Sequence, residues 1–148
     1  MSIYHYSSMI AKECKNEISA ILFHHIVYWV EMNKKNEKME HDNKFWVYQS
    51  YAQFKKRFSY LSIKQIRHSL KRLEEKELII STDEYSNSGN SGIFKTTKWY
   101  TVSEEGYKVL GDDINYVTDQ IEGAGERKLK KKMKIKTYRD SNRSTEWV

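Results

Sequence analysis

The chain has 148 residues, of which 26 are Lys or Arg and 20 are Asp or Glu, so its formal net charge is +6. Aromatic residues make up 14% of the sequence, which excludes a wholly disordered chain and predicts a compact core within about one domain. The longest apolar stretch, residues 18–30, is shorter than the roughly 20 residues that span a bilayer. With a single cysteine, Cys14, and no signal-peptide pattern, we expect a cytoplasmic protein without a membrane segment.

The first predicted element is a helix over Ile18–Met32, because apolar residues recur there at intervals of three and four. Asn16 stands where an N-cap side chain would begin this helix. A polar stretch, Asn33–Asn43, predicts an exposed loop. The aromatic and branched run Lys44–Tyr48 then predicts a short strand.

Two short helices separated by a tight turn are predicted next. Ser50 is a good N-cap for a helix over Tyr51–Phe58, and Ser62 for a helix over Ile63–Lys76. Four apolar residues of the second helix keep helical spacing and are expected to face inward: Ile63, Ile66, Leu70 and Leu73. The two helices together are a predicted helix-turn-helix unit.

Downstream the apolar period changes from about 3.6 to about 2, which indicates strands. Leu78–Thr82 and Phe94–Val102 are predicted to form a β-hairpin, or wing, around the polar tip Asp83–Gly92. Side chains of the second strand are expected to alternate between its two faces. One face would hold Phe94, Thr96, Lys98, Tyr100 and Val102, and the other Lys95, Thr97, Trp99 and Thr101. Ser103 begins a fourth predicted helix, which is bent near Gly111.

This order of elements predicts an α+β fold: a winged helix-turn-helix of three helices and a β-hairpin wing, with an extra C-terminal helix and a basic flexible tail. We expect a winged-helix domain over residues 1–102, a helical extension over residues 103–124 and a disordered tail over residues 125–148. The tail has nine basic and three acidic residues, so it carries a net charge of +6. Such a polycation would bind DNA without sequence preference, or an acidic partner.

Charge is also uneven in the body of the chain. Lys44–Leu73 holds eight basic residues and no acidic one, whereas Glu104–Glu122 holds six acidic residues and a single basic one, Lys108. A basic window inside a neutral body predicts an anion-binding face. The alternative is a solvated surface that merely lacks acidic residues.

Four stretches carry a family resemblance: residues 21–29, Trp46-Val-Tyr-Gln-Ser-Tyr51, residues 62–74 and Thr97-Lys-Trp-Tyr-Thr101. Over residues 17–102 the chain resembles the N-terminal winged-helix domain of replisome-organiser and replication-initiation proteins from phages and plasmids of low-GC Gram-positive bacteria. The resemblance implies duplex DNA binding at the nucleoid of a bacterial host, with a host or phage replication protein as a further partner. Members often continue into a helicase-engaging helical domain, but only about 45 residues follow Ser103, so we do not expect helicase loading by this chain alone.

Several residues are predicted to contact DNA. A recognition helix lies in the major groove with its N-terminal residues at base edges, so Lys64, Gln65 and His68 are expected to contact bases and Lys71 and Arg72 to contact phosphates. An ordinary solvated helix face is the alternative. Further predicted DNA contacts are Lys55, Lys56 and Arg57 in the preceding helix, the N-cap Ser62, Asn90 and Lys95 in the wing, and Lys130, Lys131 and Lys132 in the tail.

No catalytic, metal or cofactor site is predicted. His24 and His25 are adjacent and point about 100° apart on a helix, so they cannot easily chelate one ion, and the sequence has no Cys-x-x-Cys pair. His25 is expected to have a structural role on the apolar face. Gly123-Ala-Gly125 lacks the Lys and Ser or Thr of a phosphate-binding loop. We therefore expect no enzyme.

The sequence leaves three functions open. The first is sequence-specific binding of double-stranded DNA in replication initiation or its regulation, by a homodimer, because one short helix contacts few base pairs. The second is transcription regulation through the same contacts. The third is binding to a host protein through the winged-helix scaffold, as a phage-encoded inhibitor or adaptor. The acidic stretch Glu104–Glu122 suggests this function.

Overall fold

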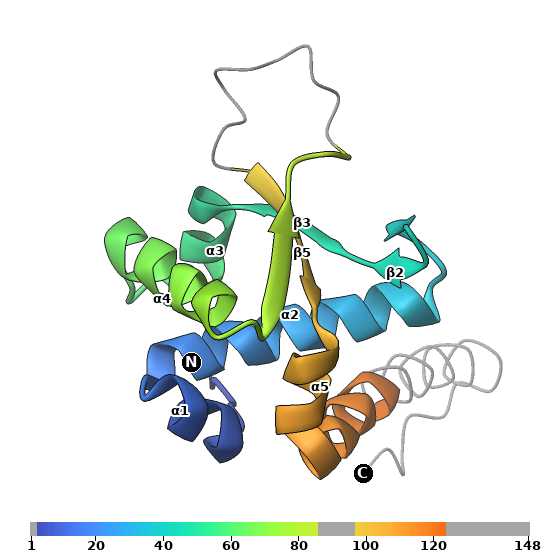
Figure 1. The fold of residues 1–148 in the computed structure, drawn as a ribbon, viewed down its shortest axis with the longest axis horizontal. Helices are drawn as coiled ribbons and strands as arrows, with labels where there is room; N and C mark the ends of the chain where they lie inside the picture. The colour runs from blue at the N-terminus through green and yellow to red at the C-terminus, as the bar shows by residue number, and fades with distance from the viewer. Residues whose placement is uncertain (1–2, 86–96, 124–148) are drawn as a thin grey trace, which may run out of the picture.

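The computed structural model describes residues 3–85 and 97–123, which form a mixed α+β fold (Figure 1). Its helices are α1 (Ser8–Cys14), α2 (Glu17–Lys35), α3 (Tyr51–Arg57), α4 (Ile63–Glu75) and α5 (Glu104–Leu110), followed by the 3₁₀ turn η1 (Gly111–Asp113) and a helical segment over residues 114–123. Its strands are β1 (Glu40–His41), β2 (Lys44–Phe45), β3 (Val47–Ser50), β4 (Ile79–Thr82) and β5 (Thr97–Val102). None of the helices in these ranges has the length and apolar character needed to cross a membrane. Three predicted features lie outside the described residues: the start of the second wing strand, most of the wing tip and the tail.

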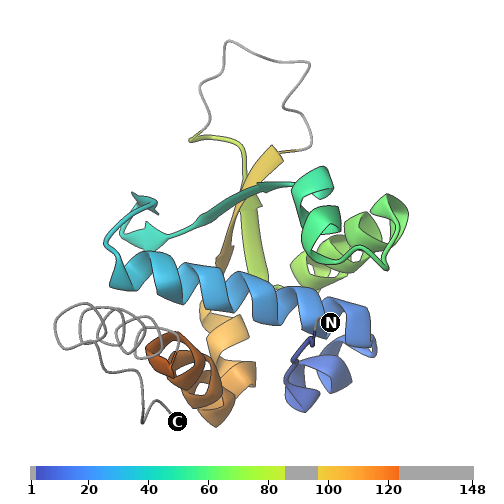
Figure 2. The same cartoon turned by 180° about the vertical axis from the view of Figure 1, so that it is seen from behind.

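Helix α2 runs through the middle of the molecule, with α4 and the larger sheet on one side and α1, α5 and residues 114–123 on the other (Figure 2). Its N-terminus is capped as predicted, because Asn16 Oδ1 accepts hydrogen bonds from the backbone N–H groups of Ile18 and Ser19, at 2.8 and 3.3 Å. Its apolar side chains are buried against both sides of the molecule: Ala20, Leu22, Phe23, Ile26, Val27 and Val30. Helix α2 is therefore the common partner of the other elements.

The C-terminal end of α2 differs from the prediction. The helix continues to Lys35, and Asn33, expected at the start of an exposed loop, is buried. Its side-chain amide Nδ2 donates a hydrogen bond to the carbonyl oxygen of Trp46 at 2.7 Å. The expectation of a loop from Asn33 was wrong because this bond, made across 13 residues of chain, satisfies a polar side chain that would otherwise face water.

The remainder of the predicted loop contains a small hairpin. Strands β1 and β2 are antiparallel, and the two residues between them, Asp42 and Asn43, have positive φ angles of 53° and 61°. This geometry is that of a two-residue hairpin turn, which favours Asp and Asn. The predicted strand Lys44–Tyr48 is interrupted at Trp46, whose indole Nε1 donates a hydrogen bond to the carbonyl oxygen of His41 at 3.0 Å.

The larger sheet has the strand order β3-β5-β4, and both pairings are antiparallel. Along the described part of the central strand β5 the side chains alternate between two faces as predicted, although Trp99, Tyr100, Thr101 and Val102 are all buried. Tyr100 and Val102 belong to the core beneath the sheet. Trp99 is covered by rings of His41, Tyr48 and Tyr85, and Thr101 Oγ1 donates a hydrogen bond to the carbonyl oxygen of Phe45 at 2.7 Å. The hairpin and its aromatic neighbours thus cover the second face of β5.

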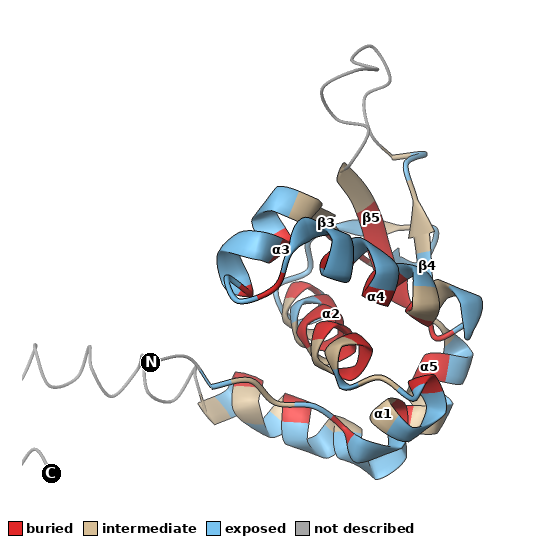
Figure 3. Ribbon diagram, turned by 90° about the vertical axis from the view of Figure 1, so that its left-hand side faces the viewer, coloured by how far each residue is buried: buried red, intermediate tan, exposed pale blue. Residues whose placement is uncertain are grey.

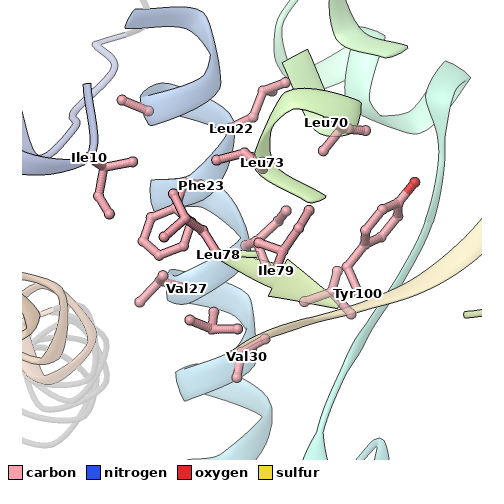
Figure 4. Close-up of a cluster of buried hydrophobic side chains, with 14 of the residues drawn as sticks. Ile10, Leu22, Phe23, Val27, Val30, Leu70, Leu73, Leu78, Ile79 and Tyr100 are labelled. Atoms are coloured by element: carbon pink, nitrogen blue, oxygen red, sulfur yellow. The ribbon is translucent and has the colours of Figure 1, made fainter. Parts of the chain in front are cut away.

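Helix α4 packs on α2 through Ile66, Leu70 and Leu73, which join the core cluster. Figure 4 shows Leu70 and Leu73 on the side of α4 that faces the core. Ser69 is also buried, and its carbonyl oxygen accepts a hydrogen bond from Ser19 Oγ at 3.1 Å. Ile63 was expected to face inward but is 39% exposed. Residues step by about 100° around a helix, so Ile63 lies only about 20° from the buried Leu70, seven residues later. Its exposure therefore comes from its place as the first residue of α4.

The chain after the sheet follows the predicted bent helix. Ser103 Oγ accepts a hydrogen bond from the backbone N–H of Gly106 at 2.9 Å and caps α5. Gly111 has a φ of 54°, and the helix resumes after η1. Helix α1 was not predicted, because it buries only Ile10 and Cys14 and so gives a weak periodic signal.

His25 has the buried position that its place on the apolar face suggested. Its ring is 8% exposed and packs against Phe54 and Phe58, and Nε2 lies 3.0 Å from Oε1 of Gln49. Burial lowers the pKa of His25 from 6.5 to about 4, because the charged imidazole is poorly solvated there. The folded protein therefore holds this ring neutral at pH 7.

Gly106 should tolerate no side chain. A Cβ at this position would lie 2.3 Å from the carbonyl oxygen of Leu78 and 2.9 Å from Cγ1 of Val102, so Gly106→Ala is expected to reduce the free energy of unfolding by about 1–3 kcal/mol. Gly123→Ala is the matched control, because a Cβ there meets no atom within 4 Å and alanine favours helix. Urea denaturation checks both, and equal stabilities of the two variants would contradict the close packing at Gly106.

Stability should depend on pH through His25. The unfolded chain binds more protons than the folded protein between pH 6.5 and about pH 4, so the contribution of the neutral ring is complete above this window and is lost as the pH falls through it. The expected loss is about 3 kcal/mol in the free energy of unfolding. In a denaturation series across this range, His25→Gln should lack this part of the pH dependence. The same pH dependence in both proteins would contradict the neutral buried ring.

Candidate nucleic-acid interface

The basic window of the sequence folds into α3, a tight turn and α4. Ser50 and Ser62 cap the two helices as predicted, each in a reciprocal capping box. The turn between the helices is held by Leu61, whose side chain is buried and whose backbone N–H donates to the carbonyl oxygen of Phe58 at 3.0 Å. Lys55 reaches the same turn, because its Nζ donates to the carbonyl oxygen of Leu61 at 2.8 Å. These local bonds fix α4 relative to α3.

The outward side of α4 is basic. Lys64, Arg67, His68 and Lys71, which we call the α4 face, are all exposed. Figure 3 shows α4 with exposed residues on its outer side and buried residues toward α2. This face carries three fixed positive charges, and the exposed carboxylate of Glu75 follows Lys71 by one turn of the same helix. It has the chemistry of a surface that attracts a polyanion.

Arg67 was absent from the predicted contacts. The prediction used Ile63 as an inward residue, and Arg67, four residues later, then fell toward the core side of the helix. In the structure the inward face is centred between Ile66, Ser69 and Leu73, so Arg67 is exposed. The signal that would have found it is its spacing, one turn after Lys64 and one turn before Lys71.

Gln65 and Arg72, two predicted contacts, are engaged within the protein. Oε1 of Gln65 accepts a hydrogen bond from the backbone N–H of Ser62 at 2.8 Å and completes the capping box. Arg72 does not lie on the outward side: its Nε donates to the carbonyl oxygen of Cys14 at 2.5 Å. The expectation that Arg72 points outward was wrong because α1, an unpredicted helix, ends beside that flank of α4, whereas its contact with phosphate stays a prediction.

The remaining predicted contacts divide between exposed and undescribed positions. Lys56 is exposed on α3. Arg57 is also exposed, and its guanidinium carbon lies 4.9 Å from the ring centre of Tyr4 and 5.4 Å from that of Phe58. The predicted contacts that lie outside the described residues are Asn90, Lys95, Lys130, Lys131 and Lys132.

The described ranges show where the metal-ligating and thiol side chains lie. No group of three or more His, Cys, Asp or Glu side chains in residues 3–85 and 97–123 is placed to hold a metal ion. His24 Nε2 lies 2.9 Å from Oε1 of Gln120, and His25 has its own partner in Gln49, so the adjacent rings have separate environments. Cys14 is buried, and burial raises the pKa of its thiol, which disfavours the reactive thiolate.

Comparison of the chain with models of protein families, with curated proteins and with solved structures finds no match. The class that the observations define is a mixed α+β protein with small antiparallel sheets and a basic helix face.

Proposed function

We propose that the chain is a winged-helix protein that recognises specific double-stranded DNA through α4. In this proposal α3 and α4 are the helix-turn-helix, α4 is the recognition helix, and β4 and β5 are the strands that lead into the wing. The observation that carries the proposal is the α4 face, with Lys64, Arg67, His68 and Lys71 exposed on a helix capped at its N-terminus.

The dimensions and chemistry of α4 support a major-groove contact. A helix is about 10–12 Å wide with its side chains, and the major groove is about 12 Å wide. Lys64, Arg67 and His68 lie in the first two turns, which a recognition helix presents to base edges. Arg and Lys donate well to the guanine acceptors O6 and N7. Lys71, one turn further, is placed for a phosphate.

We further propose a role in replication initiation or its regulation in a phage or other mobile element. The support is the resemblance to replisome-organiser and replication-initiation proteins. The stretches of this chain that carry the resemblance include two paired strands and the α4 helix. Residues 47–50 pair with residues 97–100 as strands β3 and β5, and residues 62–74 comprise α4 with its cap. Because α4 spans few base pairs, the proposal includes a homodimer on a palindromic or repeated site.

The proposal is tested first by selecting DNA from a random duplex pool with the full chain at about 150 mM salt, where non-specific binding is weak. Enrichment of one motif is expected. Footprinting on the genome that encodes the chain then separates the roles, because a repeated origin site indicates initiation and a promoter site indicates transcription regulation. Absence of any enriched motif would contradict sequence-specific recognition.

Variants of the α4 face should lose specific binding. Lys64→Ala with His68→Ala is expected to cost about 1–3 kcal/mol per lost base contact on the selected duplex, and less on random DNA. Arg67→Ala should relax the preference at one base pair. The control is Lys38→Ala with Lys108→Ala, which removes two exposed charges away from α4 and should leave the preference intact. Equal losses on selected and random DNA would show that α4 does not read bases.

The basic tail should contribute without specificity. Deletion of residues 125–148 removes a net charge of +6, so binding to all duplexes should weaken alike and its salt dependence should become shallower. Salt titration of the selected and random duplexes measures both effects. A loss confined to the selected duplex would assign base recognition to the tail.

A further inference from the structure

Two neighbouring clefts run along α2 on a surface that the α4 face does not use. The first, of about 390 Å³, lies between the N-terminal segment, α2 and the end of α3, and its lining includes Tyr4, His24, Tyr28 and Phe58. The second, of about 370 Å³, lies between α2 and β3, and its lining includes Met39, Tyr48, Gln49 and Gln53. The clefts share three residues, His25, Trp29 and Arg57, so they form one continuous surface.

The chemistry of this surface is aromatic and cationic. Trp29 stands between the clefts and is 41% exposed, and its indole contacts Tyr28 edge to face at 5.4 Å. Arg57 is the fixed charge common to both clefts. Among the described residues that line them there is no carboxylate. A ligand that fits such a lining has flat rings and negative charge.

Arg57 lies against two aromatic rings. Its guanidinium carbon is 4.9 Å from the ring centre of Tyr4 and 5.4 Å from that of Phe58, and its backbone carbonyl oxygen accepts a hydrogen bond from the hydroxyl of Tyr4 at 3.0 Å. A guanidinium is planar and carries N–H donors whose fork geometry suits a phosphate. Trp29 and Arg57 thus offer a ring platform and an anion contact on one surface.

We propose that these joined clefts bind unpaired nucleic acid, with a base stacked on Trp29 and a backbone phosphate on Arg57. Aromatic platforms beside a cationic groove are the way in which proteins bind single strands without strict sequence preference. The choice of nucleic acid among anionic ring compounds rests on the proposed function of α4. The amides of Gln49 and Gln53 and the ring of His25 add polar groups beside the platform.

The two nucleic-acid surfaces are separable by mutation. None of Lys64, Arg67, His68 and Lys71 lines either cleft, and neither Trp29 nor Arg57 belongs to the α4 face. One surface would therefore bind the duplex while the other holds an unpaired strand. Loss of one activity need not remove the other.

The test is fluorescence anisotropy of the full chain with a labelled oligothymidine of about 12 nucleotides, a length within the range of known single-strand sites, and separately with the selected duplex. Trp29→Ala is expected to weaken oligothymidine binding about 5- to 100-fold and to leave duplex binding unchanged. Trp29→Phe keeps a ring and should retain most of the affinity. Tyr6→Ala is the matched control, because Tyr6 is 42% exposed and lines neither cleft.

Three results would be decisive. Unchanged oligothymidine binding by Trp29→Ala, with thermal unfolding as in the parent chain, would overturn the inference and leave the α4 proposal standing. If Trp29→Ala loses a dimer seen by sedimentation of the parent chain while its oligothymidine binding is unchanged, the inference is also overturned and the clefts are assigned to a second copy. If α4-face variants bind the duplex normally while Trp29→Ala loses oligothymidine, the α4 proposal fails and the cleft assignment holds.

Discussion

Burial of α2 is the constraint on which the rest of the structure depends. Its apolar side chains are covered on one side by α4 and β5 and on the other by α1 and the C-terminal helical residues, so each of these elements is positioned by its contact with α2. Burying one such side chain contributes about 1.5–3 kcal/mol. Because Ile66, Leu70 and Leu73 are committed to that contact, the opposite side of α4 must face solvent. The exposure of Lys64, Arg67, His68 and Lys71 is therefore a consequence of the core.

The same packing separates charge across the molecule. The acid-free window, residues 44–73, includes α3, the turn and α4 up to Leu73, whereas the acidic residues of Glu104–Glu122 follow the sheet on α5 and the helix after it. Figure 1 shows α4 and α5 on different parts of the fold. A polyanion is attracted to the first surface and repelled by the second, so the proposed duplex would bind in a preferred orientation. The aromatic clefts along α2 lie on a third surface, and Arg57 at the end of α3 belongs to both clefts.

The local features of the fold could be predicted from the sequence, and the tertiary ones could not. Asn16, Ser50, Ser62 and Ser103 cap helices as predicted, because a cap is a bond between a side chain and backbone two or three residues away. Asn33 and Arg72 were misplaced because their partners, the carbonyl groups of Trp46 and Cys14, are distant in sequence. The candidate site was predicted in outline for the same reason: helical spacing located the basic face, but burial of Ser69 decided that Arg67 belongs to it.

The most direct test of the central claim, that α4 contacts duplex DNA, is an amide-resolved NMR titration of the 17.8 kDa chain with the selected duplex. We predict that the largest changes in amide chemical shift fall on residues 62–72 and on the turn before them. These changes should saturate at two protein chains per duplex, as expected for a homodimer on a two-fold site. Amides of α5 and of residues 114–123 should shift little. Changes concentrated on α5, with α4 unaffected, would contradict the account and turn attention to a protein partner for this fold.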